Sequence, residues 1–383
     1  MSVTAAQGFT AAGIAAGIKD SGNPDLALVV NNGPRLAAAG VFTSNRVKAA
    51  PVVWSEQVVK GGLVSAVVLN SGGANACTGP LGFQDTHATA ERAAEVLGQN
   101  AGEIAVASTG LIGLRLPMDK LLPGITKAAA ELSAHGGEKA AIAIKTTDSV
   151  HKTAVVEKDG WTVGGMAKGA GMLAPGLATM LVVLTTDADL DAGTLDTALR
   201  AATRTTFDRA DSDGCMSTND TVLLLASGAS GTVPAYDDFA AAVEQVCADL
   251  ARQLIGDAEG ASKDIKVEVI NAATEDDAVE VGRSIARNNL LKCAIHGEDP
   301  NWGRVLSAIG TTAAAFEPNR LNVAINGVWV CKDGSVGEDR DLVDMRYREV
   351  VITADLSAGS AAATIWTNDL TADYVHENSA YSS

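Results

Sequence analysis

Residues 164–180 read GGMAKGAGMLAPGLATM, and the last of them, Met180, opens the apolar run MLVVL at 180–184. A short run of apolar and β-branched residues predicts a buried strand. The five glycines and Pro175 that precede it favour an irregular segment. One threonine, Thr179, therefore stands at the start of a strand, where most threonines are simply β-branched strand residues.

Thr179 could also be a nucleophile, because the sequence around it suggests how its hydroxyl could be activated. A threonine hydroxyl needs a base, and no histidine is near in sequence. Cleavage of the Ala178–Thr179 bond would give Thr179 an α-amine with a pKa of about 8, which can deprotonate the hydroxyl of its own residue. The same hydroxyl could make the cut by attacking the preceding carbonyl, with the glycines and Pro175 holding a strained turn.

The chain alternates between helical and strand-like periods, which predicts an α/β fold. No solenoid-length repeat and no low-complexity linker marks a domain boundary. The expected helices are 84–97, 118–132 with a break near Pro123-Gly124, 192–206, 236–255 and 276–288. The expected strands are 63–69, 180–184, 266–271, 321–331 with a turn at Asn326-Gly327, and 349–353.

Composition excludes several classes of protein. The 383 residues are 47% hydrophobic and 20% charged, which excludes disorder and supplies the core of one large or two ordinary domains. A net charge of −17 argues against a nucleic-acid partner. The uncharged run 169–186 contains Pro175, three glycines and three threonines, so we expect no membrane span. The first basic residue is Lys19, so we expect no signal peptide and a cytoplasmic protein.

Residue patterns typical of metal and cofactor sites are absent or incomplete. The sequence holds no HExxH, Walker or GxSxG motif, and no CxxC pair, so neither a metal site nor a disulfide framework is expected. The stretch 169–174, GAGMLA, fits the loose dinucleotide pattern, but Pro175 and a strand follow it where a helix should begin. We expect small buried thiols at the five cysteines, which are Cys77, Cys215, Cys247, Cys293 and Cys331.

Segment 164–180 resembles the self-processing site of the ornithine acetyltransferase family of arginine biosynthesis, also called bifunctional glutamate N-acetyltransferase/ornithine acetyltransferase. The likeness runs in family order over nearly the whole chain, from Gly8 to Asn378. Further matching blocks are VFTSN (41–45), NSGGANA (70–76), STGLIG (108–113), TTD (146–148), STND (217–220), DAEGA (257–261) and GEDPNWGR (297–304).

The resemblance implies a role for individual residues. Thr179 would be the nucleophile and the first residue of a β chain, 179–383, after a cut that leaves an α chain, 1–178. Thr109 and Gly110 match the family's oxyanion hole, although alone Ser108-Thr109-Gly110 would be an ordinary turn. Lys168, otherwise a solvated loop lysine, matches a lysine that binds the substrate carboxylate. The remaining matches to substrate contacts are Thr146, Glu259, Asn378 and Ser383, the last residue of the chain.

The implied reaction is a two-step acetyl transfer. Thr179 would take the acetyl group from N2-acetyl-L-ornithine and pass it to L-glutamate, with no cofactor; acetyl-CoA is a second donor in some members of the family. The implied fold is a layered αββα core, distantly like N-terminal-nucleophile hydrolases, with a smaller additional domain. The α and β chains would stay associated, two of each, around a shared core and active site.

Some residues depart from the family pattern, and two rival functions stay open. Ser212–Ser217 reads SDGCMS where the family more often has VDGDTS, and Gly73 replaces a common asparagine. Residues 371–375 predict an extended segment that could pair with a sheet edge and bring the tail to the site. A related self-processing aminopeptidase or amidase would use water as the acceptor. A non-enzymatic binding module would keep the chain uncleaved.

Overall fold

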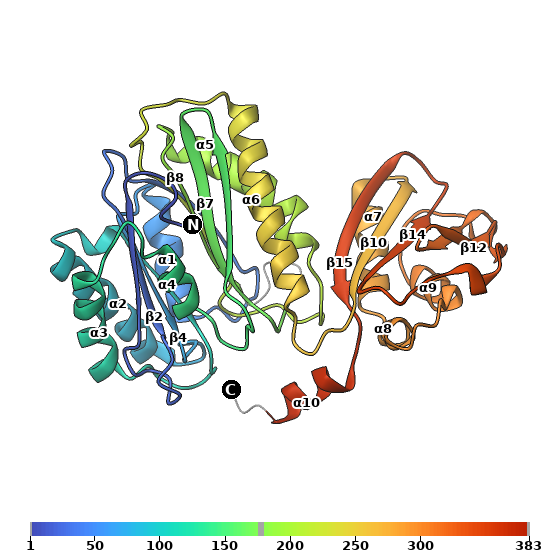
Figure 1. The fold of residues 1–383 in the computed structure, drawn as a ribbon, viewed down its shortest axis with the longest axis horizontal. Coiled ribbons are helices and arrows are strands. Elements are labelled where there is room, and N and C mark those ends of the chain that lie inside the picture. The colour runs from blue at the N-terminus through green and yellow to red at the C-terminus, as the bar shows by residue number, and fades with distance from the viewer. Residues whose placement is uncertain (1, 175–179, 381–383) are drawn as a thin grey trace. The chain divides into compact units, whose positions relative to one another are not determined.

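The computed structural model describes residues 2–174 and 180–380, which form two compact units (Figure 1). The first unit contains 2–174, 180–208 and 215–257, and the second contains 209–214 and 258–380. The first unit takes residues from both sides of the 178/179 bond.

Two sheets form the first unit, as the α/β prediction requires. One sheet has the strand order β1-β2-β4-β5, and the other has the order β3-β9-β8-β7-β6. The strands of the first sheet are β1 (Phe9–Ile14), β2 (Leu26–Asn31), β4 (Ala66–Ser71) and β5 (Ile104–Thr109). Those of the second are β3 (Ala37–Phe42), β9 (Thr221–Ala226), β8 (Leu181–Thr186), β7 (Trp161–Lys168) and β6 (Lys152–Lys158).

The alternation of side chains along β2 explains how the sheets are layered. Leu26 and Leu28 point to one face and pack against helices α2 (Gly79–Leu97) and α3 (Met118–Ala130). Ala27 and Val29 point to the other face, into a core that they share with the second sheet. Helices α5 (Ala192–Thr205) and α6 (Tyr236–Gly256) lie on the opposite side of the unit (Figure 1). The expected αββα layering is confirmed.

Two shorter helices complete the first unit, α1 (Ala50–Lys60) and α4 (Gly137–Ala143). The expected break at Pro123-Gly124 is wrong, because α3 runs through both residues. Gly124 lies so close to Ala16 that a Cβ there would be 2.6 Å from the Ala16 Cβ. Burial of Leu121 and Ile125 against the sheet outweighs the hydrogen bond that Pro123 cannot donate.

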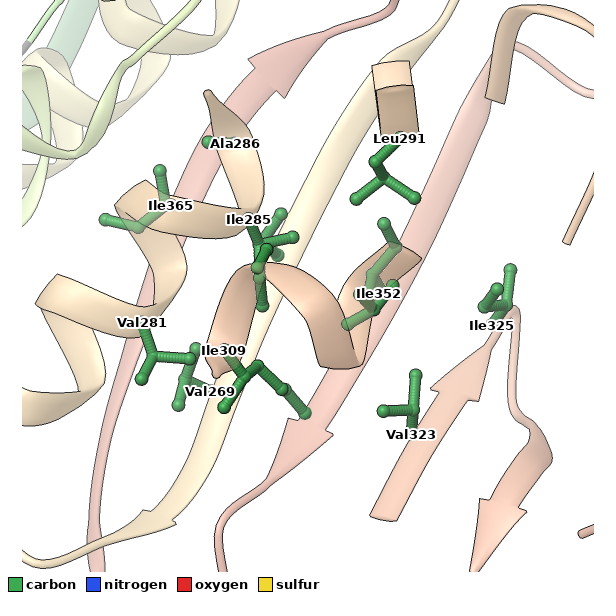
Figure 2. Packing of buried hydrophobic residues seen from close by; sticks show 14 of the residues in the cluster. Val269, Val281, Ile285, Ala286, Leu291, Ile309, Val323, Ile325, Ile352 and Ile365 are labelled. Carbon is green, nitrogen blue, oxygen red and sulfur yellow. The ribbon is translucent and has the colours of Figure 1, made fainter. Parts of the chain in front are cut away.

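The second unit is the expected smaller domain, a six-stranded sheet with the order β13-β12-β11-β14-β10-β15. Val269, Val281 and Ile352 belong to its core, where helix and sheet side chains interdigitate (Figure 2). The strands are β10 (Asp264–Ala272), β11 (Asn322–Ile325), β12 (Val328–Lys332), β13 (Ser335–Val336), β14 (Glu349–Asp355) and β15 (Ala361–Asn368). The helices are α7 (Glu275–Ala286), α8 (Asn289–His296), α9 (Trp302–Ile309) and α10 (Ala372–Ala380).

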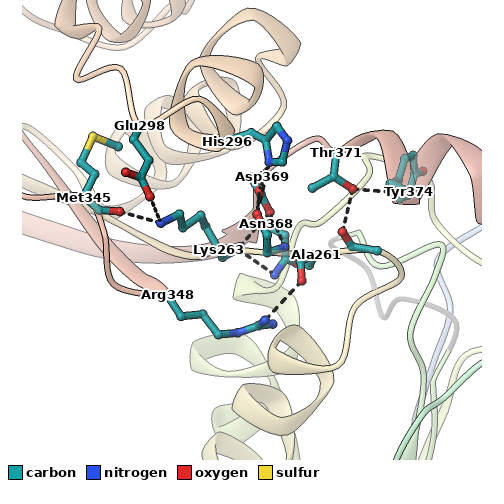
Figure 3. Close-up of polar contacts among 12 residues, drawn as sticks. Ala261, Lys263, His296, Glu298, Met345, Arg348, Asn368, Asp369, Thr371 and Tyr374 are labelled. Atoms are coloured by element: carbon teal, nitrogen blue, oxygen red, sulfur yellow. Dashed lines mark hydrogen bonds and ion pairs between the residues drawn. The ribbon is translucent and has the colours of Figure 1, made fainter.

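Helix α10 corrects the prediction of an extended segment at 371–375. The Thr371 hydroxyl accepts a hydrogen bond from the Tyr374 amide (2.9 Å) and donates one to the Gly260 carbonyl (2.6 Å), as Figure 3 shows. The threonine therefore caps the first turn of a helix and anchors it at the same time. The β-branched residues Thr371 and Val375 favoured an extended segment over this cap.

Two smaller expectations concern the cysteines and the membrane. Cys247 and Cys331 are buried as expected, but Cys77, Cys215 and Cys293 are exposed, so the expectation of buried thiols is wrong for these three. In the part of the chain that the structure describes, no helix is both long enough and apolar enough to cross a membrane.

Candidate functional site

The carboxyl end of β5 carries Thr109 and Gly110, which the sequence assigned to an oxyanion hole. Thr109 is buried, and its carbonyl accepts hydrogen bonds from the amides of Gly72 (2.9 Å) and Gly73 (3.0 Å). Gly110 has φ +124°, and a Cβ there would lie 2.6 Å from the Gly73 nitrogen. Only glycine fits this turn, so the chain direction after Thr109 is fixed by packing against a second glycine-rich loop.

Gly73 also accounts for one departure from the family pattern. A Cβ at this position would lie 2.7 Å from Leu116 Cδ2, so a larger residue would need Leu116 to move. The Gly73 carbonyl accepts a hydrogen bond from Asn70 Nδ2 (3.0 Å). Glycine here lets Leu116 pack against the loop that supports Thr109.

Lys168 lies at the end of β7, and its ammonium reaches Thr109. The distance from Lys168 Nζ to Thr109 Oγ1 is 3.2 Å, and both residues are about 1% exposed. A lysine can only donate, so the Thr109 oxygen accepts and its own proton is left to donate elsewhere. The structure thus brings together three residues that the sequence had assigned to one site, Thr109, Gly110 and Lys168.

A buried carboxylate, Asp148, joins the expected substrate contact Thr146 to the Lys168 strand. Asp148 Oδ2 accepts a hydrogen bond from the Thr146 amide (3.0 Å), and Oδ1 accepts one from the Gly169 amide (2.6 Å). Lys152 Nζ lies 2.6 Å from Asp148 Oδ1. One side chain therefore fixes the backbone of the 146 loop and the backbone that follows Lys168.

Lys152 and Asp257 complete this network. Lys152 is fully buried and also lies 2.6 Å from Asp257 Oδ2. Burial acts to raise the pKa of Asp148, but Lys168, Lys152 and the Gly169 amide outweigh it and hold that pKa well below its usual range. The carboxylate is therefore charged wherever the protein is folded near neutral pH.

The neighbouring residues Asn219 and Asp220 fix the backbone on two sides of the site. Asn219 Nδ2 donates to the carbonyls of Ala74 (2.6 Å) and Ser108 (2.9 Å). Asp220 Oδ1 accepts the Met180 amide (3.0 Å), and the Met180 carbonyl accepts the Thr221 amide (3.1 Å). The residues next to Thr109 and next to Thr179 are thus held by one short segment.

Asp220 makes stability depend on pH. It is fully buried, and this burial raises its pKa well above the usual range, against the opposing effect of the Met180 amide and the Ser217 hydroxyl. Because the folded state binds the proton more tightly, folding stability falls as pH rises from the unfolded pKa, about 3.9, toward the raised folded pKa.

Asp220→Asn should remove this pH dependence. Asparagine keeps an acceptor for the Met180 amide but has no charge to bury. The stability of the variant relative to that of the wild type should therefore increase as pH rises. Measured from pH 5 to pH 8, the melting temperature of the variant minus that of the wild type should increase with pH until Asp220 of the wild type is ionised. A difference that stays constant over this range would show that Asp220 does not titrate with a raised pKa.

Glu259 and Asn378 belong to the second unit and contact each other there. Asn378 Nδ2 donates to Glu259 Oε2 at 3.0 Å. Glu259 lines a cavity of about 270 Å³ whose charged residues include Lys292 and Arg287. Burial lowers the pKa of Lys292, against the opposing effect of Asp213 and Asp211.

The segment that follows Glu259 is anchored to the end of β15 by Asp369. Its Oδ1 accepts the amides of Ser262 and Lys263, each at 2.9 Å. Lys263 Nζ in turn lies 2.8 Å from Glu298 and 2.6 Å from the Met345 carbonyl (Figure 3). These hydrogen bonds therefore fix the backbone just after Glu259 within its own unit.

Three of the predicted site residues, Ala178, Thr179 and Ser383, lie outside the described residues. The structure tests neither the cleavage site nor the tail contact. In the part that is described, no group of three or more His, Cys, Asp or Glu side chains is arranged to hold a metal ion.

Sequence reasoning missed the charged residues that support the site. Asp148, Asp220 and Asp257 stand inside the blocks that carried the resemblance, but nothing in the blocks showed that the first two are buried or that Asp257 pairs with Lys152. The sequence also did not predict the burial of Lys152, because most lysines are exposed and nothing in the residues around it marks an exception. Of the two most buried lysines of unit 1, Lys152 contacts Asp148, and Lys168 precedes Gly169, whose amide donates to the same carboxylate.

The layered sheets and the cluster at their strand ends are those of an α/β enzyme. The chain belongs to the ArgJ family, whose model matches residues 10–383. This confirms the resemblance on which the site residues were assigned.

Close relatives match over their full length. The chain is 85% identical over 383 residues to the arginine biosynthesis bifunctional protein ArgJ of Streptomyces avermitilis, and 65% identical over 382 residues to that of Thermobifida fusca, with 100% of each chain covered. Among solved structures, ornithine acetyltransferase from Mycobacterium tuberculosis, complexed with ornithine, is 59% identical with a TM-score of 0.45. That match covers 47% of this chain and 96% of the other.

Proposed function

We propose that this enzyme moves the acetyl group of N2-acetyl-L-ornithine to L-glutamate through an acetyl-Thr179 intermediate, after cleaving its own Ala178–Thr179 bond. Membership of the ArgJ family and relatives named for arginine biosynthesis support the reaction class. The observation that carries the proposal is the contact between Lys168 and Thr109 beside the fixed turn at Gly110.

The proposed first half-reaction forms the acetyl-enzyme. The Thr179 oxygen attacks the acetyl carbonyl carbon, and the Thr179 α-amine takes the hydroxyl proton. The Thr109 hydroxyl and the Gly110 amide donate to the oxyanion. The carbon–nitrogen bond then breaks, and ornithine leaves with the proton on its amine.

The second half-reaction runs the same steps in reverse with a new amine. The glutamate amine attacks acetyl-Thr179, N-acetylglutamate departs, and the Thr179 hydroxyl regains its proton. Lys168 supplies a fixed positive charge for the α-carboxylate that both amino acids share. Thr146, Glu259, Asn378 and Ser383 are proposed as further substrate contacts, with the Glu259 carboxylate suited to the ornithine ammonium.

The test follows both products with and without glutamate. We expect ornithine and N-acetylglutamate in equal amounts, parallel lines in double-reciprocal plots, and little ornithine when glutamate is omitted. Ornithine and acetate formed at the same rate without glutamate would instead identify the amidase that the sequence left open. An uncleaved chain that binds but converts nothing would identify the binding module.

Removing the Thr109 hydroxyl should slow the reaction strongly. Thr109→Val keeps the β-branched shape in a buried strand but removes a donor to the oxyanion, so we expect kcat to fall about 10²- to 10³-fold. Thr89→Val is the matched control, because the buried Thr89 hydroxyl donates only to the Asp85 carbonyl of its own helix (2.8 Å). Equal rates in the two variants would remove Thr109 from the proposed mechanism.

The use of acetyl-CoA as a second donor is also proposed, on the ground that the relatives are named bifunctional. No further cofactor is part of the mechanism. We propose a cytoplasmic enzyme made of two α and two β chains, 1–178 and 179–383. Its partners are these small molecules and its own chains, and it acts on no nucleic acid or membrane.

A further inference from the structure

We propose that Lys19 binds the side-chain carboxylate of the acetyl acceptor and so makes the second half-reaction selective for a dicarboxylic amino acid. This inference rests on the proposed function and deepens it, because it assigns a specificity role to a residue outside the matched site residues. It starts from the position of Lys19 between two parts of the site.

Lys19 lies next to the loop that carries Thr146 and next to the glycine-rich loop that supports Thr109. Its Nζ donates to the carbonyl of Lys145 (2.6 Å), the residue before Thr146, and more weakly to the carbonyl of Pro24 (3.3 Å). Its side chain passes over Gly72, where an added Cβ would lie 3.1 Å from Lys19 Cγ. Gly72 in turn donates its amide to the Thr109 carbonyl.

The charge of Lys19 is not balanced by a carboxylate in contact with it. Among the described residues, no Asp or Glu oxygen lies within 4.0 Å of Lys19 Nζ. An ammonium has three N–H donors, and both partners of Lys19 are neutral carbonyls. A half-buried cation with neutral partners favours the arrival of an anion.

The nearest carboxylates have other partners. Asp25 accepts the backbone amides of Ala16 (2.7 Å), Ile18 (2.6 Å) and Lys19 (2.9 Å). Asp148 is bound by Lys152 and by two backbone amides. Both therefore hold the loops in place and leave the Lys19 ammonium for a ligand.

Charged groups of both signs surround Lys19, and burial acts on it most strongly. Burial lowers the pKa of Lys19; Asp25 and Asp148 act in the opposite direction, while Lys168 and Lys145 lower it further. A carboxylate in contact with the Lys19 ammonium would offset the cost of burying that charge.

The two proposed substrates differ in the group that Lys19 would meet. Both carry an α-carboxylate, for which Lys168 is the proposed partner. At the end of the side chain, glutamate has a carboxylate and ornithine has an ammonium. The Lys19 ammonium can donate a hydrogen bond to the first group and none to the second, so its loss should weaken binding of the acceptor much more than that of the donor.

The test measures the two half-reactions separately in Lys19→Gln. We expect kcat/KM for glutamate to fall about 10- to 100-fold, the usual effect of losing a hydrogen bond to a charged group. The value for N2-acetylornithine should change less than about threefold, and the preference for glutamate over glutamine should shrink by the same factor as the glutamate value. Lys120→Gln is the matched control, because Lys120 is an exposed lysine on α3 whose loss removes the same charge.

Several results would overturn the inference. An equal loss for donor and acceptor, or for glutamate and glutamine, would mean that Lys19 only supports the loops. If Lys19→Gln does not fold, the wild type decides: glutamine accepted within threefold of glutamate would contradict a carboxylate-binding lysine. A wild type that transfers no acetyl group to any acceptor would instead refute the proposed function itself.

Discussion

Thr179→Ala is expected to remain a single chain of 39.0 kDa and to transfer no acetyl group above background. The side chain supplies both proposed nucleophilic steps, the cut at its own amide and the attack on the substrate. Alanine has no oxygen to carry either step. Intact mass under denaturing conditions, measured beside the wild type, shows the cut, and an assay for N-acetylglutamate shows the transfer.

A matched variant separates loss of chemistry from loss of fold. Thr197→Ala removes a threonine hydroxyl of the first unit, one that donates to the Gly193 carbonyl in helix α5 (2.9 Å). This variant should be cleaved and active like the wild type. A wild type that stays uncut while both variants still transfer acetyl groups would refute the N-terminal-nucleophile mechanism, and the base would then have to be sought elsewhere.

Lys152→Met is expected to lower the free energy of unfolding by about 3–5 kcal/mol, the usual cost of removing one partner of a buried ion pair. Lys152 is fully buried between Asp148 and Asp257, each 2.6 Å away. Methionine fills a similar volume but leaves two carboxylates without their cation. Unfolding in urea, followed by circular dichroism, measures the change.

The control lies on the same strand. Lys158 ends β6 in an exposed position, so Lys158→Met removes an equal charge without exposing a buried partner and should change stability by less than about 1 kcal/mol. Adding Asp148→Asn to Lys152→Met should restore part of the loss, because asparagine still accepts the Gly169 amide. A Lys152→Met variant as stable as Lys158→Met would contradict the idea that the buried Lys152 ammonium stabilises the fold.

Sequence patterns predicted the fold best where one physical effect dominates. The apolar repeat of α6 and the acidic Asp191 before α5 placed these helices within one or two residues, since burial and capping act alone there. At Pro123 and at Thr371 two effects compete. Packing of α3 overrides the proline, and a side-chain cap overrides strand-like residues, and neither contact is visible before the chain has folded.

The candidate site shows the same limit. Thr109, Gly110 and Lys168 came from a resemblance, because a turn and a lysine have many uses in any sequence. Lys19, Asp148 and Lys152 acquire meaning only from distance: Lys19 meets Lys145 across 126 positions, and Lys152 meets Asp257 across 105. Contacts that join segments so far apart depend on the whole fold, so no local pattern could have predicted them.

The strand order β3-β9-β8-β7-β6 in the first unit has a consequence for when the proposed self-cleavage takes place. β7 precedes the Ala178–Thr179 bond and β8 follows it, yet the two pair along their length, and β3 pairs with β9 in the same way. Neither fragment alone contains the strands that this sheet needs. The intact polypeptide must therefore form this sheet first, and the proposed cleavage of the Ala178–Thr179 bond follows folding. Two separately translated fragments would not easily reproduce this order of events.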